Sequence, residues 1–471
     1  MVFSSLLFLF RFLPAMILAY YILPGRCRNL VLFISSLVFY AWGEPVYVVL
    51  VLFSTVTDYI AGMAVSHYKK RGLKKKAFTA VVCSAIINLS LLGFFKYAGF
   101  LISNLNMLPG VMLKEADIPL PIGISFYTFQ TMSYTIDVYR GDAKVQKNFI
   151  AFGAFVSLFP QLVAGPVIRY KTIAGQLKKR TESIDLFYKG IFRFITGLGK
   201  KVLIADQLGV LWNETAAMEN LHLTTVAAWL GVVAFTFEIY FDFSGYSDMA
   251  IGLGAMFGFT FPENFNYPYE SKSITEFWRR WHISLGTWFR EYVYIPLGGN
   301  RKGMGRQFIN IAIVWLLTGL WHGAYWNFVL WGVYYGVLLV TEKILWKKFF
   351  IKLPAAIRHI YTMAAVTFGW SLFAWQDMAD SSVFMKAMFL QAEAGIANRQ
   401  VLYLLYSNFF ILLVAVIFSS SLPKKFITGR LFPEGTVKRE VAGIVFVAVI
   451  SASCVAMLVN SSYSPFLYFR F

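Results

Sequence analysis

The chain has 471 residues, of which 58% are hydrophobic and 14% are charged, and its formal net charge is +19. Its mean hydropathy is +0.61. A soluble protein of this length would contain long polar stretches between several domains, and none interrupts the apolar runs here. The composition therefore excludes an ordinary soluble protein. Runs of about 20 apolar residues predict helices that cross a hydrocarbon core of about 30 Å.

The positive charge lies in short segments between the apolar runs. Lys and Arg concentrate in residues 67–76, 169–189, 343–358 and 424–439. This distribution is typical of cytoplasmic loops, and it favours contact with anionic lipid head groups. We therefore expect membrane lipids as partners and no nucleic acid.

The apolar runs predict a single all-α, polytopic integral-membrane domain over residues 1–471. About 11 full crossings are expected, because some candidate segments are short or tilted. The candidate spans are 2–23, 29–42, 46–66, 77–101, 120–138, 148–166, 187–212, 224–241, 307–321, 325–346, 357–375, 402–420 and 440–459. With the basic loops in the cytoplasm, the less basic segment 376–399 and the C-terminal tail from Asn460 lie outside.

The pattern changes between residues 242 and 306. Glycines and prolines interrupt it at Gly245, Gly252, Gly254, Gly258, Pro262 and Pro268. The glycines are predicted to loosen any helix through 245–260 and the prolines to stop it. Irregular backbone is tolerated at membrane depth only inside protein or around a cavity, so a re-entrant segment is expected. The apolar spacing of 275–293 then predicts one amphipathic helix at the cytoplasmic interface.

Two histidines fall in or beside these apolar segments. His322 follows the span 307–321, and His282 lies on the inward face of the predicted interfacial helix. An ionisable group at membrane depth is costly and usually marks a site, and imidazole transfers protons near neutral pH. His322 is the candidate general base, with a buried structural histidine as the alternative. His282 is expected to orient the donor, to hydrogen-bond the reacting carbonyl, or to be structural. Two histidines do not suffice for a metal site, so none is expected.

Other residues near the histidines are candidates for binding the substrate or the acyl donor. They are Asp242, Ser244, Asp248, Trp278, Arg279, Arg280, Trp281, Trp321 and Asn327. The carboxylates have a second interpretation, because charged groups in membranes are usually paired. In that interpretation they form salt bridges, with Arg279 or Arg280 as partners, that pin the re-entrant segment.

Several longer motifs occur in a recognisable order. They are Phe159–Pro166, Asp242–Gly252, Phe277–Leu285, Tyr294–Asn300, Thr318–Gly323 with Trp326-Asn327, and the ending Tyr463–Phe469. Together they resemble the membrane-bound O-acyltransferase family, in the bacterial branch that includes the membrane subunit of alginate O-acetyltransferase. The resemblance extends over nearly the whole chain, and it places the family's essential histidine at His322 and its second recurrent histidine at His282.

The resemblance implies tilted helices around a central tunnel or funnel in a bacterial inner membrane, with the catalytic region at about 240–335. The implied activity moves an acetyl group from a cytoplasmic thioester, such as acetyl-CoA, toward an extracytoplasmic polysaccharide. No bound cofactor is expected. The longest outer segment has no sugar-binding platform, so a secreted or membrane-anchored acetyltransferase partner is expected to complete the transfer.

Three alternatives stay open at this point. One is the D-alanyl transfer subunit for teichoic acids, a family member that takes its acyl group from a carrier protein. The second is a transporter with a proton-relay histidine, which the lack of internal repeats disfavours. The third is a structural scaffold for partner enzymes, which would tolerate loss of His322.

Overall fold

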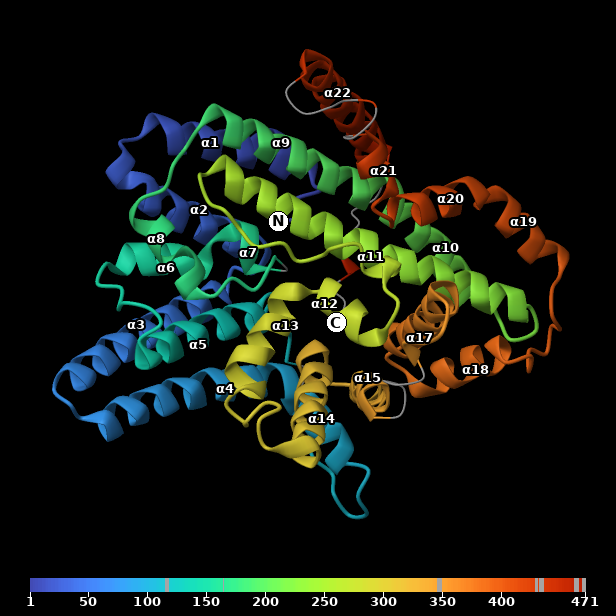
Figure 1. The fold of residues 1–471 in the computed structure, drawn as a ribbon, viewed down its shortest axis with the longest axis horizontal. Helices are drawn as coiled ribbons and strands as arrows, with labels where there is room; N and C mark the ends of the chain where they lie inside the picture. The colour runs from blue at the N-terminus through green and yellow to red at the C-terminus, as the bar shows by residue number, and fades with distance from the viewer. Residues whose placement is uncertain are drawn as a thin grey trace. The chain divides into compact units, whose positions relative to one another are not determined.

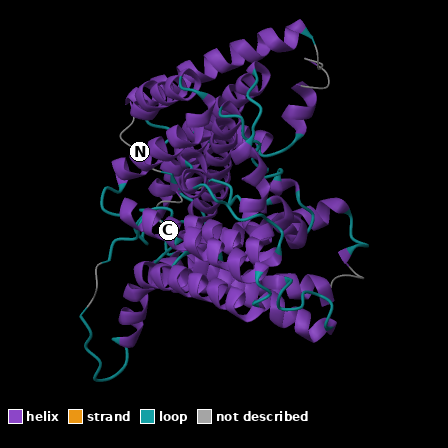
Figure 2. Ribbon diagram, turned by 90° about the vertical axis from the view of Figure 1, so that its left-hand side faces the viewer, coloured by secondary structure: helices purple, strands orange, loops and turns teal. Residues whose placement is uncertain are grey.

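The computed structural model describes residues 1–114, 118–163, 165–344, 350–427, 431, 436–460 and 466–467. In these residues the regular secondary structure is entirely helical, as Figure 2 shows. The expected all-α class is therefore confirmed. The chain divides into two compact units, one made of Met1–Phe194 with Ser247–Pro262, and the other of Ile195–Tyr246 with Glu263–Phe471.

The first unit contains the N-terminal helices, coloured blue to green in Figure 1. They are a π-helical turn at Phe8–Phe12, α1 (Leu13–Ile22), α2 (Arg28–Gly43), α3 (Val48–Lys70), α4 (Lys74–Leu105), α5 (Ile124–Arg140), α6 (Phe149–Ser157), α7 (Phe159–Leu162), α8 (Tyr170–Lys178) and most of α9 (Ile184–Gly199). Helices α3, α4 and α5 pack together. The predicted span 148–166 is wrong as one helix, because the chain turns at Leu158 between α6 and α7.

The second unit carries the candidate site. Its elements are a π-helical turn at Lys200–Ala205, α10 (Asp206–Ala216), most of α11 (Thr225–Met256), a 3-10 turn at Pro268–Glu270, α12 (Ile274–Arg280), α13 (Ile283–Phe289), a π-helical turn at Arg290–Tyr294, α14 (Gly303–His322), α15 (Trp326–Ile344), α17 (Ala355–Ala374), α18 (Met378–Met388), α19 (Arg399–Ser407), α20 (Phe409–Phe418), α21 (Leu422–Phe426) and α22 (Val437–Asn460). Helices α14 and α15 pack closely against each other.

Helix α11 corrects the expectation that the glycines loosen the chain after residue 245. The helix continues to Met256. A Cβ at Gly245 would lie 2.8 Å from the carbonyl oxygen of Gly197, and one at Gly252 would lie 2.6 Å from that of Gly190. These glycines let the backbones of α9 and α11 approach closely, so tertiary packing outweighs their weak helix propensity.

The segment 275–293 is not the single amphipathic helix that its spacing predicts. Helix α12 ends at Arg280, and α13 begins at Ile283. Between them His282 takes left-handed backbone angles, φ 46° and ψ 52°, which cost about 1–3 kcal/mol in a residue other than glycine. The expected inward position of His282 is nevertheless confirmed, because its side chain is buried.

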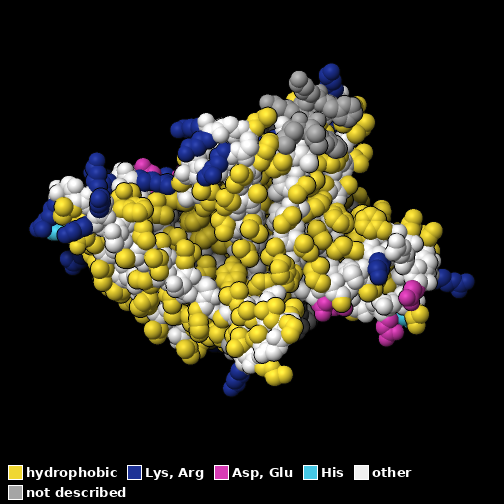
Figure 3. Space-filling view, turned by 90° about the horizontal axis from the view of Figure 1, so that it is seen from below, with side chains coloured by type: hydrophobic (Ala, Val, Ile, Leu, Met, Phe, Trp, Pro, Cys, Tyr) yellow, Lys and Arg dark blue, Asp and Glu magenta, His cyan; other side chains and the backbone are white. Residues whose placement is uncertain are grey.

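Four helices of the described chain are long and apolar enough to cross a membrane: α3, α4, α11 and α22. The pair α19 and α20, bent by 53°, makes a fifth if it is one span. The structure thus has several membrane helices but does not confirm the expected 11 crossings. Of the apolar window of α22, 6% is buried, against 83% in α11. Hydrophobic side chains cover most of the face drawn in Figure 3, as a surface in contact with lipid requires.

Candidate functional site

Hydrogen bonds from two directions hold the α12 to α13 segment in place. At the N-terminus of α12, the Glu342 carboxylate of α15 accepts from the backbone N–H groups of Ile274 at 2.6 Å and Thr275 at 2.9 Å. At its C-terminus, the N–H of Asn266 donates to the carbonyl of Arg280, at 2.9 Å. The carboxylate satisfies donors that every helix start leaves open. The turn that carries His282 is therefore fixed between α15 and the preceding loop.

His282 lies in a small polar cluster surrounded by aromatic rings. It is 3% exposed, and its Nδ1 is 3.1 Å from Oδ1 of Asn264 and 3.5 Å from Oγ of Ser284. The Phe243 ring packs edge-on against the imidazole, with 4.8 Å between centroids. The buried Nε2 has no hydrogen-bond partner within the described part of the chain.

His322 is the last residue of α14 and is 8% exposed. The rings of Trp331 and Phe373 lie edge-on to it, with centroids at 5.1 and 5.3 Å. The flanking glycines make room for the next helix, because a Cβ at Gly319 would lie 2.3 Å from the carbonyl oxygen of Phe328. Close packing of α15 therefore puts His322 at the end of α14 among aromatic side chains.

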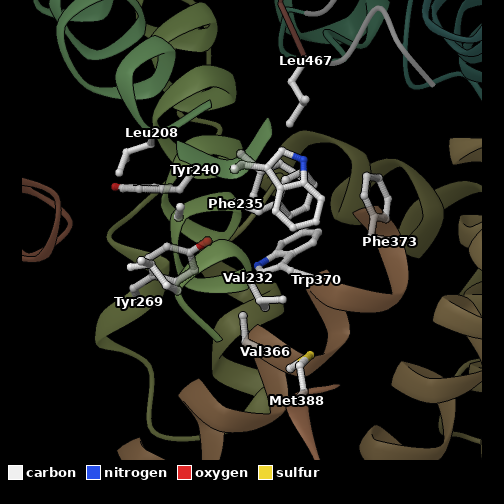
Figure 4. Close-up of a cluster of buried hydrophobic side chains, with 14 of the residues drawn as sticks. Leu208, Val232, Phe235, Tyr240, Tyr269, Val366, Trp370, Phe373, Met388 and Leu467 are labelled. Carbon is white, nitrogen blue, oxygen red and sulfur yellow. The ribbon is translucent and has the colours of Figure 1, made fainter. Parts of the chain in front are cut away.

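A small cavity lies beside His322. It is lined by Ile239, Asp242, Phe243, Trp281, His322, Trp370, Phe373 and Leu467. Water-sized spheres can place their centres in about 20 Å³ of it, which is room for about one water molecule. Figure 4 shows Leu467 pointing toward the aromatic cluster that contains Trp370 and Phe373 of α17. These side chains therefore leave little free space for an acyl group beside His322.

Asp242, in the wall of the cavity, forms an ion pair with Lys201. Nζ of Lys201 is 2.6 Å from Oδ1 of Asp242 and 2.8 Å from Oδ1 of Asp206, and the other oxygen of Asp242 accepts from the N–H of Leu467 at 2.9 Å. Lys201 also lies over the ring of Phe466, 4.9 Å from its centroid. Buried charges persist only when paired in this way. The pair thereby holds residues 466–467 against the core.

The structure brings some of the candidate residues together at this site. Asp242 and Trp281 line the cavity with His322, and the Trp321 ring contacts both imidazoles, with centroids 5.9 Å from His282 and 5.1 Å from His322. Asn327 is buried and donates from Nδ2 to the carbonyl of Phe373, at 3.2 Å. His282 does not itself line the cavity.

Other candidates lie elsewhere or have different contacts. The ring of Trp278 packs on Trp315, Arg279 is exposed, and Ser244 is buried in α11. Arg280 pairs with Glu276 at 2.8 Å and Glu270 at 3.9 Å. Asp248 belongs to the first unit and pairs with Arg193 at 2.6 Å. The expected salt bridges therefore exist, but Lys201 and Arg193 are the cations, rather than Arg279 or Arg280.

Several contributors to the site were not predicted from the sequence, among them Phe243 and Asn264 inside the region 240–335. Trp370 and Phe373 lie outside the predicted catalytic region 240–335, as do Lys201 and Leu467. Two adjacent lysines, Lys200 and Lys201, interrupt the apolar run 187–212. Because charged residues at membrane depth usually mark a site, this sequence feature could have pointed to Lys201. The aromatic residues of 357–375 gave no signal, because any buried span contains such residues.

Known proteins that are similar to this chain are named as acyltransferases. The model described as "MBOAT, membrane-bound O-acyltransferase family" matches residues 47–388. A probable alginate O-acetylase of Pseudomonas putida is 40% identical over 489 residues, covering 100% of each chain. A peptidoglycan O-acetyltransferase of Helicobacter pylori is 33% identical, covering 82% of this chain and 80% of its own. A teichoic acid D-alanyltransferase of Bacillus subtilis is 29% identical, covering 54% of this chain and 68% of its own.

Proposed function

Because this chain belongs to the membrane-bound O-acyltransferase family, we propose that it moves an acetyl group from a cytoplasmic thioester toward an extracytoplasmic polysaccharide. The chain is a multi-pass membrane acyltransferase, and family membership favours the enzyme over the transporter and the scaffold. The full-length similarity to a protein named as an alginate O-acetylase supports acetyl as the acyl group.

The observation that carries the proposed mechanism is the position of His322 in the cavity wall. In the proposed reaction His322 removes the proton of an attacking hydroxyl, whose oxygen bonds to the thioester carbonyl carbon. The C–S bond then breaks, and the imidazolium returns the proton to the leaving thiolate. The surrounding rings of Trp331 and Phe373 limit the water beside His322, and water would otherwise hydrolyse the thioester.

The donor and the topology are part of the same proposal. Acetyl-CoA is the proposed donor, with an acyl carrier protein as the alternative. The protein is proposed to lie in the bacterial inner membrane with about 11 crossings around a central tunnel or funnel and with its C-terminus outside. The basic segments would then face the cytoplasmic donor. Contact with anionic lipid head groups follows from the same charge distribution.

A partner is proposed to complete the transfer. The longest predicted outer segment, residues 376–399, contains the short helix α18 and no aromatic platform for a sugar polymer. The acetyl group would therefore pass to a secreted or membrane-anchored acetyltransferase, which modifies the polysaccharide. Full acetylation of the polymer by this protein alone, in liposomes with donor inside, would overturn this division of labour.

The decisive experiment reconstitutes the purified protein with radiolabelled acetyl-CoA and a hydroxyl acceptor. Transfer of label that depends on the thioester is expected. Loss of this transfer in a monodisperse His322→Ala variant would support His322 as the general base. A parallel reaction with D-alanyl carrier protein distinguishes the teichoic acid alternative. Transfer from that donor but not from acetyl-CoA would overturn the acetyl assignment.

A further inference from the structure

The side chain of Asn264 is held with its oxygen toward His282. The backbone N–H of Ser284 donates to Oδ1 of Asn264 at 3.2 Å, and the Ser284 hydroxyl lies 2.8 Å from the same atom. A backbone N–H can only donate, so the accepting atom is the amide oxygen and not the amide nitrogen. Asn264 is fully buried. Its backbone carbonyl also accepts from the N–H of Ile283, at 2.9 Å.

This orientation determines where His282 carries its proton. Its Nδ1 is 3.1 Å from the Asn264 oxygen, and two atoms form a hydrogen bond only if one of them supplies the hydrogen. The oxygen has none, so Nδ1 is protonated. In a neutral imidazole the other nitrogen then has a bare lone pair. Neutral is the form that burial among aromatic rings favours.

We propose that Asn264 is a positioning residue that holds His282 as the Nδ1–H tautomer, so that Nε2 accepts a hydrogen bond from an O–H or N–H group of the bound substrates other than the attacking hydroxyl, whose one proton goes to His322. This inference rests on the proposed function, because it assumes that the substrates of acyl transfer bind beside His282. The buried Nε2 has no hydrogen-bond partner within the described residues, as a site for an incoming donor requires. In this tautomer Nε2 of His282 can only accept a hydrogen bond, so it cannot donate one to the reacting carbonyl.

The surroundings of the imidazole allow a clean test with an added charge. The contacts of the ring are with Asn264, Ser284, Phe243 and Trp321, all of them uncharged. The titratable or charged groups on the elements packed around it are Glu238, Tyr240, Asp242, Tyr246 and Asp248 on α11, Glu276, Arg279 and Arg280 on α12, Arg306 and His322 on α14, and Glu263 beside Asn264. None of these is among the contacts of the ring given above. A carboxylate at position 264 would be the first charge to touch the imidazole.

The first experiment compares Asn264→Asp with Asn264→Leu in the reconstituted transfer assay across pH. Asp still accepts from Nδ1 and favours imidazolium, so Asn264→Asp should keep activity and move the acid limb of the pH–rate profile to higher pH. Asn264→Leu should lower the rate about tenfold or more, because the tautomer is no longer held. Equal losses in both variants with unshifted profiles would overturn the proposal.

Asn310→Asp is the matched control for burying a carboxylate. Asn310 is also fully buried, but its Nδ2 donates to the carbonyl of Gly299, at 2.9 Å. The acid limb of the pH–rate profile of Asn310→Asp should stay at the wild-type pH. A shift as large as that of Asn264→Asp would show a general charge effect and overturn the specific role of Asn264.

The second experiment reads the tautomer itself and does not depend on activity. The chain has five histidines, so selective ¹⁵N labelling gives few signals, and His282→Gln identifies the one from His282. Protonated Nδ1 and unprotonated Nε2 are expected in the wild type, with the pattern lost in Asn264→Leu. Protonated Nε2 in the wild type would overturn the inference. Failure of acetyl transfer in the wild type would instead contradict the proposed function.

Discussion

Asp242 and Leu467 are 225 positions apart, yet the Leu467 N–H donates to the Asp242 carboxylate at 2.9 Å. Both residues line the cavity that His322 faces. Lys201 neutralises the same carboxylate from a third part of the chain. The cavity wall is therefore assembled by an electrostatic anchor, and residues near the C-terminus contribute directly to the space beside the proposed base.

We expect His322→Gln to reduce acyl transfer by about 10²–10⁴-fold, the range that general-base catalysis typically contributes. Gln keeps a polar side chain but cannot take a proton. His222→Gln is the control, because His222 is exposed outside the site and its replacement should leave the rate near wild type. Transfer of labelled acetyl by monodisperse protein measures both. Retention of more than about a tenth of the rate by His322→Gln would contradict the role.

Lys201→Met should destabilise the protein by about 3–5 kcal/mol, because it leaves the buried Asp242 carboxylate without its cation. Adding Asp242→Asn should recover part of this loss by removing the uncompensated charge. Thermal unfolding followed by size-exclusion chromatography measures the order of stabilities. Lys171→Met is the control, since Lys171 and Asp142 form a more exposed pair at 3.5 Å that is worth about 1 kcal/mol or less. Equal losses of stability in Lys201→Met and Lys171→Met would contradict the proposed importance of the pair between Lys201 and Asp242.

Leu467→Ala should let the enzyme use longer acyl donors. The cavity has little free space, and removing part of its wall leaves room for extra methylenes. The rate ratio of butyryl-CoA to acetyl-CoA should rise about tenfold or more, since one methylene changes discrimination by about 10–200-fold. Leu413→Ala, at a site that is 43% exposed, should keep the wild-type ratio. An unchanged ratio in Leu467→Ala would show that donor length is selected elsewhere.

Cysteine labelling in intact cells tests the orientation. Cys27, Cys83 and Cys454 are first replaced. Single cysteines in 67–76 and 424–439 should then be shielded from an impermeant thiol reagent, whereas those in 380–395 and near Ser461 should react. Ser461 and parts of 424–439 lie outside the described residues. Labelling of the basic segments from outside would contradict the topology and the proposed side for the donor.

The sequence by itself determined the helical membrane class, because continuous apolar runs leave the backbone no other way to satisfy its polar groups in lipid. It also singled out His322, since an ionisable residue at the end of an apolar helix carries a cost that packing alone does not explain. The family followed from long motifs in order. These inferences depend on local composition and spacing, which the printed sequence contains in full.

Only the tertiary structure decided how the site is assembled. The spacing of 275–293 predicts one helix, but the segment breaks at His282, where contacts with Asn264 and Glu342 hold the two shorter helices. The glycines of α11 weaken a helix locally, but close packing against α9 makes them necessary. Leu467 and Lys201 reach Asp242 from distant positions. Such contacts arise from the three-dimensional packing of separate segments, and no local pattern records which segments will meet.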